Sequence, residues 1–246
     1  MISPPVADDG AAPAHPTVAA FDFDGTLTRG GSVVPFLISV RGLLPVLQAL
    51  LVCSPKLLRA SIFGGPAADD AKESVFVRVV SGVPATQADR AGARFAQQHL
   101  RRRLRPEVRD RLEWHRRQGH QVVIVSASPE CYVRPAGQSL GTDDVLATRL
   151  AVDASGNLTG RYDGKNCRGA EKYARLVAWL RDHVASGPGI SQPTLWAYGN
   201  SRSDLRLLEA ADHGVDAGQL GRFGRLHRFP TLATVERAQA SDPARA

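Results

Sequence analysis

The chain has 246 residues, 43% of them hydrophobic and 22% charged, a composition that is typical of a folded globular protein and excludes a disordered or fibrous one. Its three cysteines, Cys53, Cys131 and Cys167, form no CxxC pair, which argues against a zinc site and favours a reducing compartment. The net charge of +7 favours anionic partners, such as phosphorylated metabolites, an acidic membrane surface or nucleic acid, without choosing among them.

Residues 1–16 are rich in proline and contain two adjacent aspartates. They lack the basic start and the apolar centre of a secretory signal. We therefore expect a disordered tail over 1–16 and a cytoplasmic protein.

An apolar run, Val18 to Phe21, leads into two carboxylates, Asp22 and Asp24, and the chain then breaks at Gly25. Residues two apart on a strand project to the same side, so both carboxylates are expected to reach one pocket at the end of a buried strand. Two negative charges that close need a neutralising partner, and oxygen ligands of this kind suit Mg²⁺.

The segment 33–58 is strongly apolar, but Arg41 lies inside it and Pro35 and Pro45 interrupt it. A spanning helix usually needs about 20 apolar residues without such a charge. Buried or cap helices are the favoured interpretation. A helix that lies on a membrane or partner surface stays open as an alternative, and a true span is the least favoured.

Residues 69–118 have a helical pattern, with turns near 82–84 and 105–106. Apolar side chains recur every fourth residue at Leu100, Leu104, Val108 and Leu112, which predicts one buried face. The other face is crowded with arginines between 101 and 117. We favour a solvated face over an anion-binding one, because the aromatic platform that single-stranded nucleic acid needs is missing, and we expect no nucleic-acid partner.

Two further β-branched or aromatic runs predict strands, at 121–125 and 194–198, and each is followed by polar residues. Residues 146–152 and 158–162 flank a turn-forming stretch and predict a hairpin. The helix after it is expected to have an apolar face made by Tyr173, Leu176, Val177, Leu180 and Val184.

Strands that alternate with helices predict an α/β protein with a Rossmann-like parallel sheet, in which ligands bind beyond the carboxyl ends of the strands. The helical region after the first strand is too long for one crossover helix. We therefore predict an inserted α-helical cap at 35–104, a core made of 17–34 and 105–236, and a disordered tail at 237–246.

This arrangement predicts phosphomonoester hydrolysis. Asp22 can attack phosphorus and form an aspartyl-phosphate, while Asp24 protonates the leaving oxygen and then activates water. Mg²⁺ would reduce the repulsion between the carboxylate and the phosphate. Ser126 could donate a hydrogen bond to a phosphate oxygen, and a lysine could supply positive charge.

Four stretches in this order resemble the motifs of the haloacid dehalogenase-like phosphatases, and more narrowly the phosphoserine-phosphatase-like subfamily IB, which has a helical cap between the first two motifs. The stretches are Asp22-Phe-Asp-Gly-Thr-Leu-Thr28, Val123-Ile-Val-Ser-Ala-Ser128, Cys167-Arg-Gly-Ala-Glu-Lys172 and Tyr198-Gly-Asn-Ser-Arg-Ser-Asp204.

The resemblance implies Asp22 as nucleophile, Asp24 as general acid and base, and Ser126 as a phosphate donor. It places the lysine of the third motif best on Lys172, with Lys165 as the alternative. It implies substrate or phosphate contacts for Phe23, Gly25, Thr26, Ala127 and Lys172. The implied Mg²⁺ ligands are Asp22, Asp24 through its carbonyl oxygen, Asn200 and Asp204.

The chain departs from the family pattern at two positions. Asn200 stands where relatives commonly have an aspartate, which predicts weaker Mg²⁺ binding and keeps open a catalytically impaired protein that only binds a phosphorylated ligand. Gly31 stands where serine-specific relatives carry a carboxylate, so phosphoserine phosphatase is the alternative rather than the first choice. Segment 33–58 resembles the corresponding region of phosphatidylglycerophosphate phosphatases. The predicted substrate is therefore a small-molecule phosphate or a phospholipid headgroup, the latter with peripheral membrane contact through 33–58.

Overall fold

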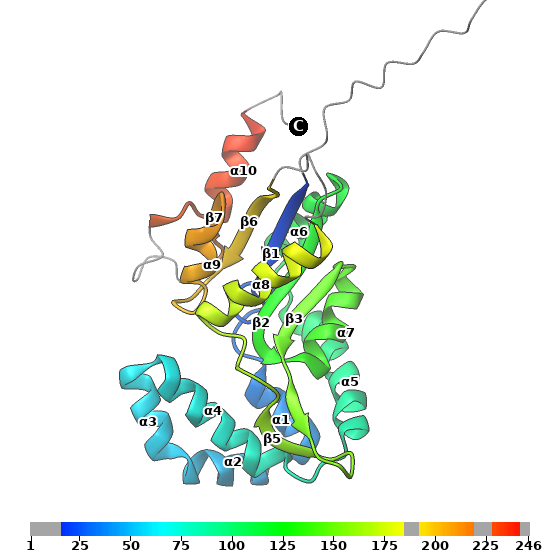
Figure 1. The fold of residues 1–246 in the computed structure, drawn as a ribbon, viewed down its shortest axis with the longest axis vertical. Coiled ribbons are helices and arrows are strands. Elements are labelled where there is room, and N and C mark those ends of the chain that lie inside the picture. Colours follow the sequence, from blue (N-terminus) through cyan, green and yellow to red (C-terminus); the bar gives the residue numbers. More distant parts are fainter. Residues whose placement is uncertain (1–15, 185–191, 219–227, 242–246) are drawn as a thin grey trace, which may run out of the picture.

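The computed structural model of the chain describes residues 16–184, 192–218 and 228–241 (Figure 1). Its centre is a five-stranded sheet in the order β3-β2-β1-β6-β7, and every neighbouring pair of strands is parallel. The strands are β1 (Thr17–Phe21), β2 (Gln121–Pro129), β3 (Asp144–Thr148), β6 (Thr194–Gly199) and β7 (His213–Asp216). The predicted α/β class with a parallel sheet is confirmed.

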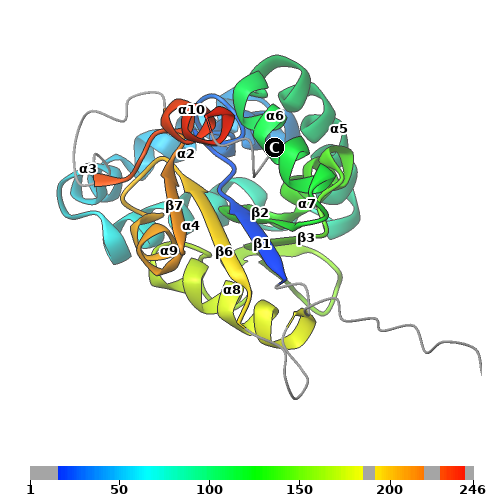
Figure 2. The ribbon, with the colours of Figure 1, turned by 90° about the horizontal axis from the view of Figure 1, so that it is seen from above.

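Helices cover both faces of the sheet (Figure 2). Val18 and Ala20 of β1 pack with α8 (Ala170–His183) and α9 (Leu205–Ala210) on one face. Ala19 and Phe21 point to the other face, which is covered by α6 (Pro106–Arg117), α7 (Glu130–Leu140) and α10 (Leu232–Ala240). Both faces of β1 are therefore apolar and buried, which explains its continuous hydrophobic run.

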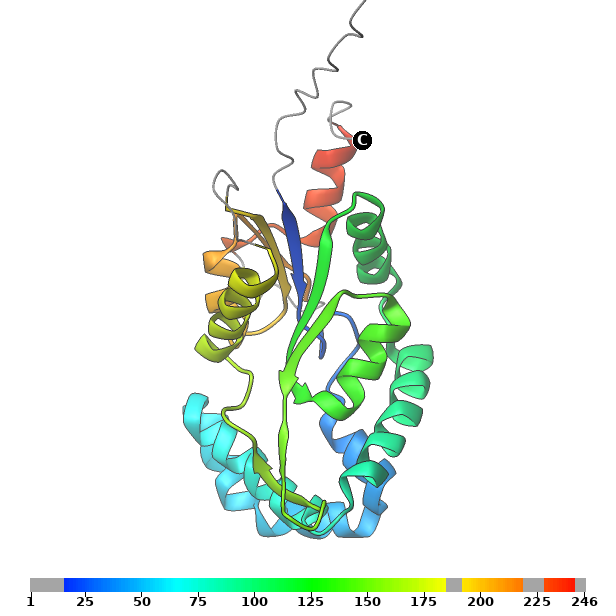
Figure 3. The ribbon, with the colours of Figure 1, turned by 45° about the vertical axis from the view of Figure 1, so that its right-hand side comes forward.

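Six helices lie between β1 and β2. The first five of them lie toward the opposite end of the molecule from α10 (Figures 1 and 3). They are α1 (Val33–Arg41), α2 (Leu43–Val52), α3 (Ser54–Phe63), α4 (Gly65–Val80) and α5 (Ala85–Arg103). These helices extend from Val33 to Arg103, nearly the residues of the predicted cap, 35–104, whose status as a separate domain stays a prediction. An antiparallel hairpin of β4 (Leu150–Val152) and β5 (Leu158–Tyr162) lies against α4, where the Tyr162 amide donates to Glu73 at 3.0 Å.

Several sequence predictions were wrong in detail. Residues 146–152 are not one hairpin strand, because β3 ends at Thr148 in the main sheet and β4 begins at Leu150. Tyr173 and Val177 are 39% and 43% exposed, because only one side of α8 packs on the sheet. The predicted tail at 237–246 begins inside α10, which extends to Ala240. Residues 1–15 and 242–246 of the predicted tails lie outside the described residues.

The arginine-rich face is also not wholly solvated. The turn predicted near 105–106 is confirmed, because α5 ends at Arg103, Leu104 caps it, and Val108 and Leu112 lie on α6. Arg111 is buried and lies 4.0 Å from the ring centre of Trp114 and 4.8 Å from that of Trp196. Its Nε donates to the Tyr198 hydroxyl at 2.6 Å. Arg111 therefore holds α6 against the sheet instead of offering charge to a ligand.

Candidate active site

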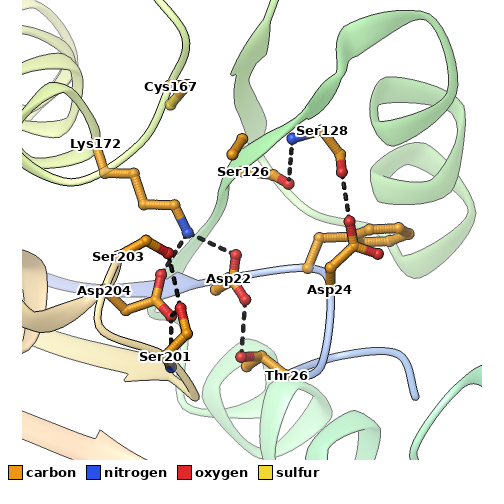
Figure 4. A network of polar contacts seen from close by, with 12 residues as sticks. Asp22, Asp24, Thr26, Ser126, Ser128, Cys167, Lys172, Ser201, Ser203 and Asp204 are labelled. Carbon is orange, nitrogen blue, oxygen red and sulfur yellow. Dashed lines mark hydrogen bonds and ion pairs between the residues drawn. The ribbon is translucent and has the colours of Figure 1, made fainter. Parts of the chain in front are cut away.

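The Asp22 carboxylate lies at the carboxyl end of β1, in the middle of the sheet (Figure 4). Its backbone amide donates to the Tyr198 carbonyl at 2.9 Å, which extends the pairing with β6 by one residue and fixes the side chain. Lys172 Nζ lies 2.5 Å from Asp22 Oδ1, and Thr26 Oγ1 donates to Asp22 Oδ2 at 3.0 Å. The carboxylate is thus buried, oriented and neutralised from one side.

Lys172 enters the site from the first turn of α8 and is buried. Its Nζ also lies 2.6 Å from Asp204 Oδ1, so one ammonium joins two buried carboxylates. Burial alone would lower the pKa of Lys172, but Asp204 and Asp22 raise it above its ordinary value. Burial and Asp204 raise the pKa of Asp22, and Lys172 opposes that rise. Lys172 is therefore protonated, whereas the alternative, Lys165, is exposed on the surface.

Asp204, the predicted metal ligand of the fourth motif, is surrounded by hydrogen-bond donors. Its Oδ1 faces Lys172, and its Oδ2 accepts from the Ser201 hydroxyl at 2.8 Å and from the backbone amides of Asn200 and Ser201. Burial would raise the pKa of Asp204, but Lys172 and these hydrogen bonds hold it below its ordinary value. Asp204 therefore positions Lys172 and the loop after β6, and its role as a Mg²⁺ ligand stays a prediction.

The Asp24 carboxyl projects toward the cap side and is held by hydroxyl groups. Its Oδ2 accepts from Ser32 at 2.9 Å and from Ser128, and the Ser32 hydroxyl lies 2.7 Å from that of Tyr132. The other oxygen, Asp24 Oδ1, is buried and has no hydrogen-bond partner among the described residues. One half of this carboxyl is therefore anchored, and the other half is free to exchange a proton with a ligand.

The turn after Asp24 needs a glycine, because Gly25 has a φ of 82° and a Cβ there would lie 2.0 Å from Asn200 Nδ2. The buried guanidinium of Arg105 holds the same turn by donating to the carbonyl oxygens of Gly25 and Thr26 at 3.0 and 3.1 Å, and to that of Ala217. Arg105 was predicted to be solvated. In a run of arginines, the sequence does not indicate which side chain is buried.

A divalent cation fits beside this turn. One terminal atom of the Asn200 amide lies 3.2 Å from Asp22 Oδ2 and 3.1 Å from the Asp24 carbonyl oxygen. As nitrogen it donates to both oxygens, and as oxygen it joins them as a third hard ligand of the kind that Mg²⁺ prefers. Within the described part of the chain, no group of three His, Cys, Asp or Glu side chains is arranged to hold a metal. The site thus offers one carboxylate, one carbonyl and one amide.

The remaining predicted residues lie around the same strand ends. Ser126 is buried, and its hydroxyl accepts from the Ser128 amide at 3.1 Å. The Ala127 carbonyl accepts from Thr148 at 2.8 Å. The Phe23 side chain is fully buried near Tyr132 in the core, so only its backbone is available to a substrate.

Lys72 of α4 was not predicted as a site residue. Its Nζ donates to the Ala127 carbonyl at 2.5 Å and to Asn166 Oδ1 at 3.3 Å, and Asn166 donates in turn to Asp69 of α4 at 2.6 Å. These contacts join the cap to the loop after β2. Burial is the main cause that lowers the pKa of Lys72 to about 8. The spacing of Asp69 and Lys72 places them on one helix face, but only the fold shows what that face contacts.

Comparisons with known proteins agree with this geometry. The model of the haloacid dehalogenase-like hydrolase family matches residues 19–209. The chain is 32% identical over 204 residues to Protein CicA of Caulobacter vibrioides, and the aligned region covers 80% of this chain and 84% of that protein. It is 28% identical over 233 residues to the probable phosphatase Rv3661 of Mycobacterium tuberculosis, and the aligned region covers 86% of this chain and 72% of that protein.

Two solved structures are similar in fold. One is a protein of unknown function from Bordetella pertussis Tohama I, with a TM-score of 0.68 at 19% identity, covering 92% of this chain and 96% of that one. The other is a substrate-bound phosphoserine phosphatase, with a TM-score of 0.61 at 17% identity, covering 92% and 97%. Because the family model extends from β1 to α9 and contains every residue of the site, the chain belongs to the haloacid dehalogenase-like hydrolase family.

Proposed function

We propose that the protein is a Mg²⁺-dependent phosphomonoesterase that works through an aspartyl-phosphate on Asp22. The observation that carries this proposal is the pairing of two differently held carboxyls. Asp22 lies next to the Lys172 ammonium, and Asp24 has one anchored oxygen and one free oxygen. A nucleophile and a proton donor need these two environments.

In the first step, an Asp22 carboxylate oxygen attacks phosphorus, and the bond between phosphorus and the alcohol oxygen breaks. Asp24 begins protonated and gives its proton to the departing oxygen, so the product leaves as a neutral alcohol. Lys172 stays protonated throughout, because Asp22 and Asp204 both hold its charge. It stabilises the negative charge that collects on the transferring group.

In the second step, Asp24, now ionised, takes a proton from water while the water oxygen attacks phosphorus. The bond between phosphorus and Asp22 breaks, which releases phosphate and restores both starting protonation states. The hydroxyls of Ser32 and Ser128 hold Asp24 in place for both proton transfers. Asp22, the Asp24 carbonyl and Asn200 would hold Mg²⁺, which would supply positive charge against the phosphate oxygens.

The substrate we propose is a small-molecule or lipid phosphate monoester. Phosphoserine is a weaker candidate although a solved structure of similar fold is a phosphoserine phosphatase. Gly31 offers no carboxylate to an amino group, and α1 begins beside it with Ser32 directed to Asp24. The alternative function is that of a protein that binds a phosphorylated ligand without hydrolysing it. It stays open because Asn200 leaves the cation site with a single carboxylate, which predicts weaker Mg²⁺ binding.

A p-nitrophenyl phosphate assay with Mg²⁺ and the Asp22→Asn variant tests the reaction. We expect turnover by the native protein and a loss of at least about 10,000-fold in the variant, because covalent catalysis has no substitute in the site. Asp153→Asn, in the exposed turn of the β4–β5 hairpin, is the matched control and should keep full activity. Binding of inorganic phosphate by the native protein without any turnover would favour the binding protein.

A further inference from the structure

The two cap helices α2 and α3 expose an unusual amount of apolar surface. Leu44, Leu51 and Phe63 are 71%, 75% and 73% exposed. The other large apolar side chains exposed on these helices are Leu43, Leu47, Val52, Leu58 and Ile62. Single exposed leucines are ordinary, but a contiguous group on consecutive helices marks a surface that is covered by something else. We call these eight side chains the cap apolar face.

The composition of α2 points to an apolar environment on both of its sides. Gln48 is its only polar residue, yet only Val46 and Ala49 are buried against the rest of the protein. A helix that is hydrophobic all round normally lies in a protein core or in a membrane. Most of the apolar side chains of α2 are therefore in contact with solvent, although the sequence of the helix fits an apolar environment.

The charged residues of the segment that carries the cap apolar face all have one sign. Residues 33–68 contain no aspartate or glutamate, and their charged residues are Arg41, Lys56 and Arg59. Lys56 pairs with Asp70 of α4, at 3.1 Å. No ion pair of Arg41 or Arg59 occurs within the described ranges, and Arg59 lies 6.0 Å from the ring centre of Phe63, within the apolar face. Apolar side chains flanked by unpaired arginines match the boundary between acyl chains and anionic headgroups.

The geometry fits contact with a membrane surface better than insertion across it. No single helix in the described parts of the chain is long and apolar enough to cross a membrane, whereas α2 and α3 together reach that length but are bent by 65°. Both helices lie at the cap end of the molecule, far from α10 (Figures 1 and 3). This end can rest on a flat surface while the core faces away from it.

We propose that the cap apolar face docks the protein on an anionic lipid bilayer, with the apolar side chains in the interface and Arg41 and Arg59 at the headgroups. A second copy of the chain is a poorer occupant. A two-fold contact through this face would bring the unpaired arginines of both copies together, with no acidic residue in the segment to pair with them. Docking itself does not depend on the proposed reaction.

Sedimentation with vesicles tests the docking. We expect the full chain to bind vesicles that contain phosphatidylglycerol and phosphatidylcholine, and to bind much less to phosphatidylcholine alone or at high salt. The variant Leu44→Gln/Leu51→Gln/Phe63→Gln should bind at least about 30-fold more weakly, because it removes three large apolar contacts. Arg41→Gln/Arg59→Gln should lose the preference for anionic vesicles.

The control variant is Val152→Gln/Val177→Gln, which removes two exposed apolar side chains elsewhere on the molecule and should bind vesicles like the native chain. All variants should keep their melting temperature and their turnover of p-nitrophenyl phosphate, which separates a failure of docking from a failure of the reaction. Equal binding by the native chain and the triple variant would overturn the proposal. So would a dimer in light scattering that the triple variant abolishes, without binding to vesicles.

Discussion

The core and the cap of this protein differ in how completely their side chains are paired or buried. In the core, buried polar groups at the strand ends are paired, as Lys172 is with Asp22 and Asp204, and the free oxygen of Asp24 is an exception at the place where a substrate would react. In the cap, apolar side chains of α2 and α3 are left in solvent. In both regions, groups without a partner indicate the site of function. In the core this is the unpaired oxygen of Asp24, and in the cap it is the exposed apolar side chains of α2 and α3.

The two regions also pack against each other, with Phe95 of α5 on the ring of Tyr132 of α7. Lys72 and Asp69 of α4 reach the Ala127 carbonyl and Asn166 of the core. If the core supplies the chemistry and the cap supplies access, variants in the core should change the rate of the reaction. Variants at the cap contacts should instead change stability and substrate affinity.

The largest effect after loss of the nucleophile is expected at Asp24. Asp24→Asn should lower kcat by about 100- to 10,000-fold, because the amide cannot transfer the proton. The loss should be greater for an alkyl phosphate than for p-nitrophenyl phosphate, whose leaving group needs less protonation. Steady-state kinetics with both substrates measures this, and equal losses would remove Asp24 from the role of acid.

Lys172→Met should lower both activity and stability. Activity should fall by about 100- to 1,000-fold through loss of charge stabilisation. The free energy of unfolding should fall by about 3–5 kcal/mol, because two buried carboxylates lose their common partner. Denaturant unfolding and initial rates measure the two effects. Lys165→Met is the matched control at an exposed lysine and should change neither; a loss there equal to that at Lys172 would reverse the assignment.

Asn200→Asp tests the cation site with a smaller expected change. A second carboxylate should lower the Mg²⁺ concentration for half-maximal activity about tenfold, which corresponds to about 1.4 kcal/mol. Titration calorimetry with Mg²⁺ should show the same gain in the absence of substrate. Asn157→Asp makes the same chemical change in the hairpin turn and should leave Mg²⁺ binding as it is. No gain at position 200 would mean that Asn200 is not a ligand.

The smallest effect concerns the pH dependence of the contact between cap and core. The pKa of Lys72 is lowered from 10.5 to about 8, mainly by burial, so the unfolded chain binds more protons than the folded chain between these values. This group therefore makes stability rise with pH in that window. The melting temperature of the native chain relative to Lys72→Met should increase between pH 8 and 10.5. A constant difference would show that the ammonium is not buried.

Much of the catalytic core could be predicted from the sequence, because strand ends in a parallel sheet meet at one edge wherever the strands lie in the chain. Asp22, Thr26, Lys172 and Asn200 were expected at one place and lie there. Asp204 was expected to bind the cation, which stays a prediction, whereas the backbone amides of its own loop that donate to its Oδ2 were not foreseen. That detail depends on local turn geometry, which motif spacing does not specify.

The residues that were missed are those whose role depends on long-range packing. Arg105 turns inward to the Gly25 turn. Ser32, just before α1, donates to Asp24, and Tyr132 of α7 contacts the Ser32 hydroxyl. Lys72 is one of many charged residues in a long helical stretch. The pattern of the apolar segment 33–58 favoured buried or cap helices over a surface helix, whereas most large apolar side chains of α2 are exposed.

The most direct test of the central claim is chemical trapping of the intermediate on Asp22. During turnover of p-nitrophenyl phosphate with Mg²⁺, borohydride reduces an acyl phosphate to an alcohol, and peptide mass spectrometry then locates the change. We predict homoserine in place of aspartate at position 22, and none when substrate is left out. Reduction at Asp24 instead, or turnover with position 22 unmodified, would contradict the account.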